Sequence, residues 1–264
     1  MDLKLENKRV LVTGSTGGIG AGIARRFAEE GATVVINGRR ADAAEQMATA
    51  IREAGGKAVI ALGDLSKDED VANILARINA ELGGIDILVN NAASGEHQND
   101  METPAAGWMN SYNSNVLSMV RLIQKLLPAM QEQGWGRIIN ISSGAATKPS
   151  PGMGVYSTTK AAINNLTVTL AQGMSNDNVT INAVSPGAVF TPETGEYFVE
   201  HGLAADANEA RAVMDKMAGD GVPFNRAAEV DEIANVVLFL ASPLASYIHG
   251  ANIRVDGGYV PTVN

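Results

Sequence analysis

The stretch "RVLVTGSTGGIG" (Arg9–Gly20) decides how the chain is expected to fold. A short apolar run leads directly into a glycine-rich turn, and a helical pattern follows the turn. Glycine allows a tight turn and lets the backbone approach a phosphate, which then lies at the N-terminus of the helix. Strand, glycine turn and helix in this order predict the first βα unit of a dinucleotide-binding sheet.

The glycine spacing leaves the subtype of this turn open. Gly14, Gly18 and Gly20 fit the pattern TGxxxGxG, whereas Gly14, Gly17 and Gly20 fit GxxGxxG. Either pattern places backbone N–H groups around a phosphate. The predicted cofactor contacts of the turn are Gly14, Ser15, Thr16, Gly18, Ile19 and Gly20.

Further apolar runs alternate with helical patterns along the rest of the chain. Most are apolar continuously, as expected of strands buried on both faces of a parallel sheet. Between them, segments such as Glu69–Leu82 carry apolar residues at helical spacing. The runs begin near Arg9, Thr33, Ala58, Ile85, Arg137, Val179 and Ala251. This alternation predicts one α/β domain over residues 1–264, a Rossmann-like, doubly wound parallel sheet of about seven strands in the order 3-2-1-4-5-6-7 with helices on both faces.

One interval, residues 191–226, lacks a clear strand. It contains "PETGEYFVEHG" and then a helical pattern, "NEARAVMDKMAG". Ligands bind beyond the carboxyl ends of parallel strands, so an excursion directly after the sixth strand is expected to cover a substrate. The alternative is a decorative insertion.

The composition excludes several classes of protein. The 264 residues carry a formal net charge of −9, which argues against a nucleic-acid partner because phosphate binding needs basic faces. The absence of cysteine suits a reducing cytosol, and no secretory signal or membrane-spanning run is visible. His97, His201 and His249 lie far apart, without metal-ligand spacing. A cytoplasmic protein with no metal, nucleic-acid or membrane partner is expected.

The end of the second strand, "VVINGRR", indicates which cofactor is bound. An acidic residue at the tip of this strand would bind the ribose 2′-hydroxyl of NAD. Gly38 stands there instead, and Arg39 and Arg40 follow. Arginine offers planar donors that match a phosphate, so NADP(H) is predicted over NAD(H), with Arg39 as the main contact. The alternative is that both arginines are simply solvated.

Polar residues also follow the third and fourth strands. Asp64 of "GDLS", with Leu65 beside it, can accept a bond from an adenine amino group, cap the next helix, or do both. Asn90 and Asn91 of "VNNAAS" come at the switch point of the sheet. The predicted cofactor contacts therefore include Asp64, Leu65, Asn91 and Ala92.

More motifs complete a pattern that covers nearly the whole chain. They are "NNA" at Asn90–Ala92, Asn115, "NISS" at Asn140–Ser143, YxxxK at Tyr156–Lys160, "SPG" at Ser185–Gly187 and "VDGG" at Val255–Gly258. Together with the glycine turn they resemble the short-chain dehydrogenase/reductase family, in its single-domain classical type.

The resemblance implies a set of site residues. The catalytic residues would be Asn115, Ser143, Tyr156 and Lys160, with Ser143 preferred over Ser142 because it lies 13 residues before Tyr156. Tyr156 and Lys160 would also contact the cofactor, and Pro186, Gly187, Val189 and Thr191 would lie beside its nicotinamide. The family further implies a homotetramer, or a homodimer, built partly on the helix that carries YxxxK.

The implied chemistry is the reduction of a ketone. The nicotinamide would supply the hydride, and Tyr156 the proton, although a free tyrosine has a pKa of about 10. A lysine charge about 4 Å away, at an effective dielectric of about 20, contributes about 4 kcal/mol, equivalent to lowering that pKa by up to about 3. Lys160 is therefore expected to lower the pKa of Tyr156 toward neutral pH. Ser143 is expected to position the substrate oxygen. Asn115 would anchor a water of a proton relay, or would simply bond the backbone.

The sequence leaves the substrate open. Met153, Phe190, Tyr197, Phe198 and Met214 could line an apolar pocket or belong to the core, and Glu96 and His97 could reach a polar substrate or lie on the surface. Ala93 stands where the resemblance leads one to expect glycine, which adds a methyl group near the cofactor.

Several functions fit the motifs. The first is a carbonyl reductase or secondary-alcohol dehydrogenase, and a variant is a 3-oxoacyl-thioester (acyl carrier protein) reductase of fatty-acid synthesis. Arg121, Lys125 and Arg137 are too few and too scattered to indicate a docking patch for an acyl carrier. Two further functions compete with these: a non-catalytic dinucleotide-binding regulator, and an extended-type enzyme acting on sugar nucleotides.

Overall fold

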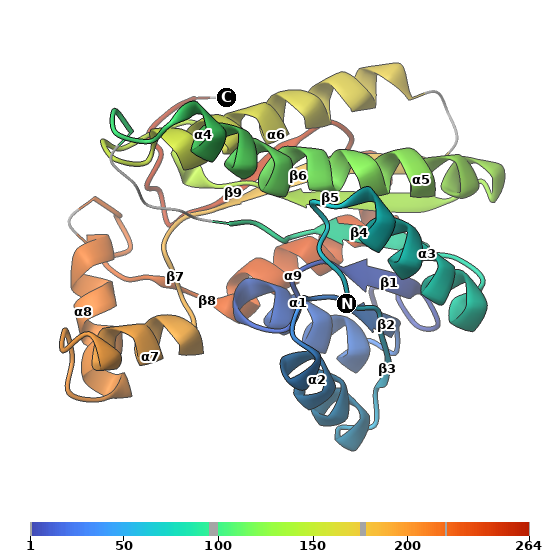
Figure 1. The fold of residues 1–264 in the computed structure, drawn as a ribbon, viewed down its shortest axis with the longest axis horizontal. Coiled ribbons are helices and arrows are strands. Elements are labelled where there is room, and N and C mark those ends of the chain that lie inside the picture. The colour runs from blue at the N-terminus through green and yellow to red at the C-terminus, as the bar shows by residue number, and fades with distance from the viewer. Residues whose placement is uncertain (1, 95–99, 175–177, 220, 264) are drawn as a thin grey trace.

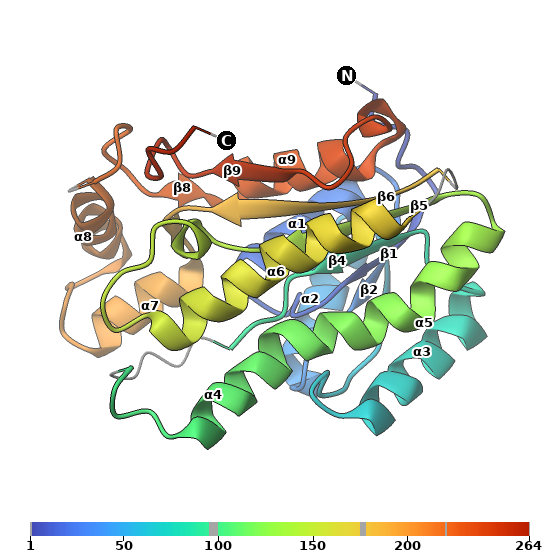
Figure 2. The ribbon, with the colours of Figure 1, turned by 90° about the horizontal axis from the view of Figure 1, so that it is seen from above.

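Strand β1 (Arg9–Val12) pairs in parallel with β2 (Thr33–Ile36) and with β4 (Ile87–Asn90). The computed structural model describes residues 2–94, 100–174, 178–219 and 221–263, and within them the main sheet has seven strands in the order β3-β2-β1-β4-β5-β6-β9 (Figures 1 and 2). Its other strands are β3 (Lys57–Ile60), β5 (Gly136–Ile141), β6 (Val179–Pro186) and β9 (Asn252–Val255). The predicted strand order is confirmed, with β9 as the last strand of the sheet.

Helices cover both faces of this sheet, which explains why its strands are apolar on both sides. Val10 and Val12 of β1 belong to one buried cluster, and Leu11 between them belongs to the cluster on the opposite face. The first face is covered by α1 (Gly18–Glu29), α2 (Ala41–Glu53) and α9 (Val230–Ala241), and the second by α3 (Asp68–Leu82), α5 (Ser118–Glu132) and α6 (Gly154–Gly173). Val10, Leu11 and Val12 are fully buried, so the doubly wound prediction is confirmed.

A continuous helical segment leads from the loop after β4 to the outer layer. It consists of α4 (Ala105–Tyr112), a π-helical turn (Asn113–Leu117) and α5. Short 3-10 turns lie at Gly144–Ala146 and Pro243–Ala245. Among the described residues, none of these helices combines the length and apolar character needed to cross a membrane.

The interval after β6 is folded and helical. β7 (Val189–Phe190) pairs in parallel with β8 (Ala228–Glu229), and between them in sequence come α7 (Pro192–Glu200) and α8 (Ala207–Gly219). Phe198 of α7 and Ala210 of α8 are buried against each other's helices, and both helices lie at one end of the molecule in Figure 1. The predicted helical segment is α8. That the interval covers a substrate stays a prediction.

Candidate active site

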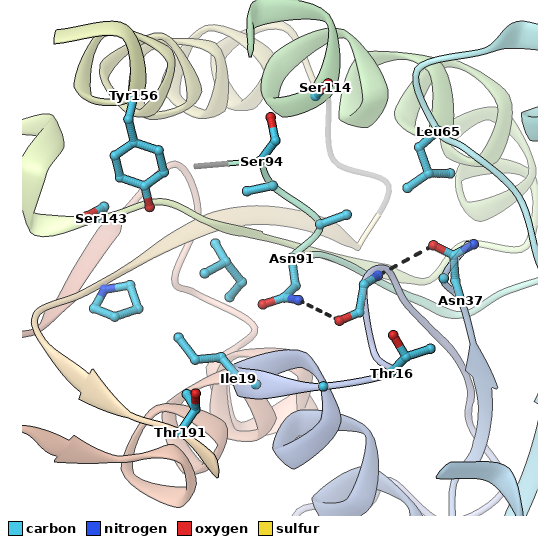
Figure 3. A pocket seen from close by; sticks show the side chains of 18 of the residues that line it. Thr16, Ile19, Asn37, Leu65, Asn91, Ser94, Ser114, Ser143, Tyr156 and Thr191 are labelled. Carbon is cyan, nitrogen blue, oxygen red and sulfur yellow. Dashed lines mark hydrogen bonds between the residues drawn. The ribbon is translucent and has the colours of Figure 1, made fainter. Parts of the chain in front are cut away.

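A cavity of about 720 Å³ opens where β1, β2, β4, β5 and β6 end. Open parallel sheets bind ligands at this edge, and the volume is in the usual range for a small-molecule site. The cavity brings together residues that lie far apart in the sequence (Figure 3). The predicted residues that line it are Gly14, Thr16, Gly18, Ile19, Arg39, Asp64, Leu65, Asn91, Ala92, Ser143, Tyr156, Lys160, Pro186, Gly187, Val189 and Thr191.

Four predicted residues do not line this cavity. Ser15 is buried, and its N–H and Oγ bond the backbone of Asn37 at 2.9 and 3.0 Å. Gly20 is buried within the first turn of α1. Arg40 is exposed at the N-cap position of α2, and Asn115 is completely buried. Direct cofactor or substrate contacts of these residues remain predictions.

The glycine turn forms an open cradle at the start of α1. Gly14 and Gly18 have φ angles of 62° and 53°, in the left-handed region that favours glycine. The side chain of Asn91 donates to the carbonyl oxygen of Thr13 at 3.0 Å and to that of Gly14 at 3.3 Å (Figure 3). A Cβ atom on Gly20 would lie 2.4 Å from that amide nitrogen. The first turn of α1 holds no acidic residue, so the cradle fits the phosphates of a dinucleotide.

One carboxylate that the sequence did not single out lies against the same turn. Glu193, in the first turn of α7, accepts a bond from the N–H of Gly18 at 2.8 Å. A Cβ atom on Gly17 would lie 2.4 Å from the Oε1 atom of Glu193. A phosphate bound to the Gly18 N–H would therefore have to displace this carboxylate. No local sequence pattern predicts this contact, because 175 residues separate Gly18 from Glu193.

Arg39 and Asp64 line the part of the cavity beyond β2 and β3. A hydrogen bond from the Ser66 backbone is the main reason that the pKa of Asp64 is lowered, and the nearby charge of Arg39 contributes. Asp64 Oδ1 accepts from Ser66 N and Oγ at 3.0 and 2.8 Å. Asp64 thus closes the turn before α3, whose N-cap position is Lys67. The exposed guanidinium of Arg39 suits a further phosphate on the cofactor.

Tyr156 projects from the first turn of α6 into the cavity, with its hydroxyl directed toward Ser143 (Figure 3). Burial of the hydroxyl raises the pKa of Tyr156, and a side-chain hydrogen bond with Ser143 opposes that rise. Ser143 Oγ also accepts from Ala145 N at 3.1 Å, which fixes the serine just beyond β5. Tyr156 is therefore protonated at neutral pH, and its hydroxyl lies beside that of Ser143.

Lys160 lies one turn further along α6 and is 2% exposed. Its Nζ donates to the carbonyl oxygen of Ile141 at 2.8 Å and lies 5.4 Å from the centre of the Tyr156 ring. Burial lowers the pKa of Lys160 to about 8. The expected fall of the Tyr156 pKa toward neutral pH is not found: burial of the hydroxyl raises the pKa overall, and the Lys160 amine bonds a backbone carbonyl.

Asn115 connects the π-helical turn to two neighbouring segments. Its Oδ1 accepts from Ser94 N at 2.8 Å, and its Nδ2 donates at 3.1 Å to both Ser94 O and Thr159 Oγ1. These bonds agree with the reading of Asn115 as a buried residue that bonds the backbone. A part in a proton relay remains a prediction.

Several residues of this region were not predicted from the sequence, and others were named there only as alternatives. Polar lining residues that it did not single out are Thr194, Asn37, Ser66, Ser94 and Ser114. Of the suggested pocket residues, three pack between α7 and α8, namely Phe190, Phe198 and Met214. Tyr197 is exposed, and Met153 directly precedes α6. Glu96 and His97 lie outside the described residues. No group of three or more His, Asp or Glu side chains in the described part of the chain is arranged to hold a metal ion.

Comparisons with known proteins find oxidoreductases along the whole chain. A family model described as "Enoyl-(Acyl carrier protein) reductase" matches residues 14–260. The uncharacterised oxidoreductase YvrD of Bacillus subtilis is 38% identical over 98% of this chain and 99% of its own. The 3-oxoacyl-[acyl-carrier-protein] reductase FabG of Aquifex aeolicus is 37% identical over 98% and 99%. The L-sorbose reductase of Gluconobacter frateurii, solved with NADPH and L-sorbose, superimposes with a TM-score of 0.94 at 32% identity, covering both chains fully.

Proposed function

The chain belongs to the short-chain dehydrogenase/reductase family, and on that basis we propose that it transfers hydride between NADP(H) and a carbonyl or secondary alcohol of a small molecule. Tyr156 is the general acid in reduction and the general base in oxidation. The observation that carries the proposal is the grouping of Tyr156, Ser143 and Lys160 in one cavity whose other end is the glycine turn.

Ser143, Tyr156 and Lys160 each have a separate role in the reduction. When bound, the cofactor supplies hydride to the carbonyl carbon. The hydroxyl of Ser143 donates a hydrogen bond to the substrate oxygen and holds that oxygen beside Tyr156. Tyr156 then gives its proton to the same oxygen, so the carbonyl becomes an alcohol and a tyrosinate remains. The nearby positive charge of Lys160 stabilises the tyrosinate until a proton returns.

The preference for NADP(H) rests on the tip of β2. Gly38 occupies the position at which a carboxylate would bind an NAD ribose, and Arg39 lines the cavity next to it. A guanidinium binds a phosphate in a bidentate manner. The similar L-sorbose reductase was solved with NADPH, which supports the same choice here.

We further propose that the enzyme is a cytoplasmic homotetramer, or a homodimer. The lack of cysteine suits a reducing compartment. Helix α6 buries Ile163 and Thr167 against its own chain and leaves Ala161, Asn165 and Val168 exposed. This second face is compatible with packing against a helix of another copy.

The proposal is tested by following NADPH absorbance with panels of ketones, sugars, steroids and acetoacetyl thioesters. We expect turnover with at least one panel, and slower turnover when NADH replaces NADPH. Cofactor binding without turnover on any panel would instead support a non-catalytic regulator.

A 3-oxoacyl-thioester reductase is the second candidate, supported by the description of the matching family model and by the FabG relative. An acidic carrier protein needs a basic docking face. Arg137 is buried and Arg121 is paired with Asp68, which disfavours such a face. If acetoacetyl thioesters were the best substrates of the panels, this candidate would replace the first.

A further inference from the structure

Helix α6 lacks an N-terminal cap from its own sequence. Met153 occupies the N-cap position and makes no side-chain cap bond, and the first turn holds no acidic residue. The first N–H groups of a helix have no partner within the helix, and they attract a negative charge. The helix that carries Tyr156 therefore needs its acceptor from elsewhere in the fold.

Asp100 supplies that acceptor from the segment that precedes α4. Its Oδ1 accepts from Gly154 N at 2.6 Å and from Val155 N at 3.3 Å. Its Oδ2 accepts from Gly152 N at 3.1 Å. One carboxylate thus binds three backbone donors directly before Tyr156, across 54 residues of sequence.

The space around the carboxylate is as closely fitted as its hydrogen bonds. A Cβ atom on Gly154 would lie 2.8 to 2.9 Å from the carboxyl atoms of Asp100. Gly154 is not among the glycines with positive φ, so its backbone conformation would accept alanine. The carboxylate of Asp100 is what excludes a side chain at this position.

We propose that Asp100 is a positioning residue, which fixes the first turn of α6 so that the Tyr156 hydroxyl stays against Ser143. This role rests on the proposed function, in which that hydroxyl delivers a proton. Lys160 lies one turn later and is held separately by Ile141 O, and the glycine turn is held by Asn91. Loss of Asp100 should therefore misplace the proton donor and leave cofactor binding intact.

The catalytic half of the test compares Asp100→Ala with Asp100→Asn in the full-length protein. We expect Asp100→Ala to lower kcat at least about tenfold, because small misplacements of reacting groups are costly, while the Kd for NADPH stays unchanged. Asp100→Asn keeps one oxygen that can accept from Gly154 N, and should restore most of kcat. Unchanged kcat in Asp100→Ala, or an equal loss of NADPH binding, would overturn the positioning role.

The structural half needs no turnover. Asp100→Ala should lower Tm by about 2–4 °C, as expected for loss of a cap, and should speed hydrogen exchange in residues 152–156. Gly154→Ala should lower Tm in the wild-type background and not in the Asp100→Ala background, where the clash is gone. Gly173→Ala in the same helix, where a Cβ would meet nothing within 4 Å, should have the same effect in both backgrounds.

The two halves separate failure of the inference from failure of the proposed function. If the wild type turned over no carbonyl, the proposed function would fail. Non-additive Tm changes of Asp100→Ala and Gly154→Ala, with faster hydrogen exchange, would still show that Asp100 holds the first turn of α6. If the Tm changes of Asp100→Ala and Gly154→Ala were additive and hydrogen exchange in residues 152–156 were unchanged, the role of Asp100 in fixing this turn would be refuted, whatever the activity.

Discussion

Tyr156 and Lys160 lie one turn apart on α6, and burial changes their pKa values in opposite directions. The pKa of Tyr156 is raised and that of Lys160 is lowered to about 8. Pairs of titratable groups whose pKa values move apart are characteristic of acid–base sites. At neutral pH this arrangement keeps the tyrosine protonated, as an acid for carbonyl reduction must be.

The buried Lys160 gives stability a defined pH dependence. Its pKa is about 8 in the folded chain against an ordinary 10.5, so between these values the unfolded chain binds more protons and stability rises with pH. Relative to Lys160→Met, the wild type should gain on the order of a few kcal/mol across that window, at about 1.4 kcal/mol per pKa unit. Denaturant unfolding of both proteins from pH 7.5 to 10.5 measures this. A constant difference between them would contradict it.

Arg39 should determine the cofactor preference. Arg39→Ala removes the proposed charge-assisted phosphate contact, so NADPH binding should weaken about 10- to 100-fold and NADH binding should change little. Arg40→Ala is the matched control, because Arg40 is the neighbouring exposed arginine and does not line the cavity. Fluorescence titration gives both Kd values. Unchanged NADPH binding in both variants would show that the arginines are only a solvated pair.

Single residues differ in how far the sequence predicts them. The sequence could group Ser143 with Tyr156 because the family resemblance supplies the spacing between them, and both residues line the cavity. Glu193 and Asp100 could not, because each carboxylate meets backbone N–H groups of a helix that is distant in sequence. Such contacts depend on how whole elements pack, and no local pattern encodes them.

At the scale of elements, burial on both faces made the strands predictable. Every position of β1 after Arg9 is buried, so the strand appears in the sequence as an unbroken apolar run. The short β7–β8 pair and α7 lack such a pattern, because β7 and β8 contain no buried residue and α7 buries only Gly195 and Phe198. The π-helical turn was also missed. It contains Asn115, which bonds backbone groups of a different segment.

Helix α7 should respond to cofactor binding through Glu193. The carboxylate accepts from the Gly18 N–H that a cofactor phosphate would need. Glu193→Gln removes this competing charge from the N-terminus of α1, so it should tighten NADPH binding about two- to fivefold. Isothermal titration at low ionic strength measures the change.

Glu196→Gln is the matched control for this substitution. Glu196 is exposed on the same helix, so its replacement makes the same change in net charge away from the Gly18 contact. It should leave the Kd for NADPH unchanged. Weaker NADPH binding in Glu193→Gln would instead mean that the carboxylate helps to hold the cofactor site together.

At the scale of the whole molecule, the strand order places the two halves of the site side by side. β1, β2 and β3 bring the glycine turn, Arg39 and Asp64 to one side, and β4, β5 and β6 bring Asn91, Ser143 and Pro186 to the other. All strands of this sheet are parallel, so their carboxyl ends meet at one edge. The alternation of strands and helices was enough to predict this layout.

Assembly is a prediction at the same scale. Sedimentation should give four times, or twice, the chain mass of 27.5 kDa. Val168→Glu, on the exposed face of α6, should shift the mass toward smaller species. Met217→Glu on α8 is the control, because its side chain is 66% exposed against 47% for Val168. A monomeric wild type, or equal effects of both substitutions, would contradict assembly through α6.

The central claim is that Tyr156 delivers the proton in a reaction that depends on NADP(H). Tyr156→Phe keeps the ring and removes only the hydroxyl, so kcat and the Kd for NADPH, measured on the same preparation, test the claim most directly. We predict a fall in kcat of at least about 100-fold, the usual contribution of a general acid, with a Kd within about twofold of the wild-type value. A variant that kept kcat within about tenfold of wild type would contradict the claim.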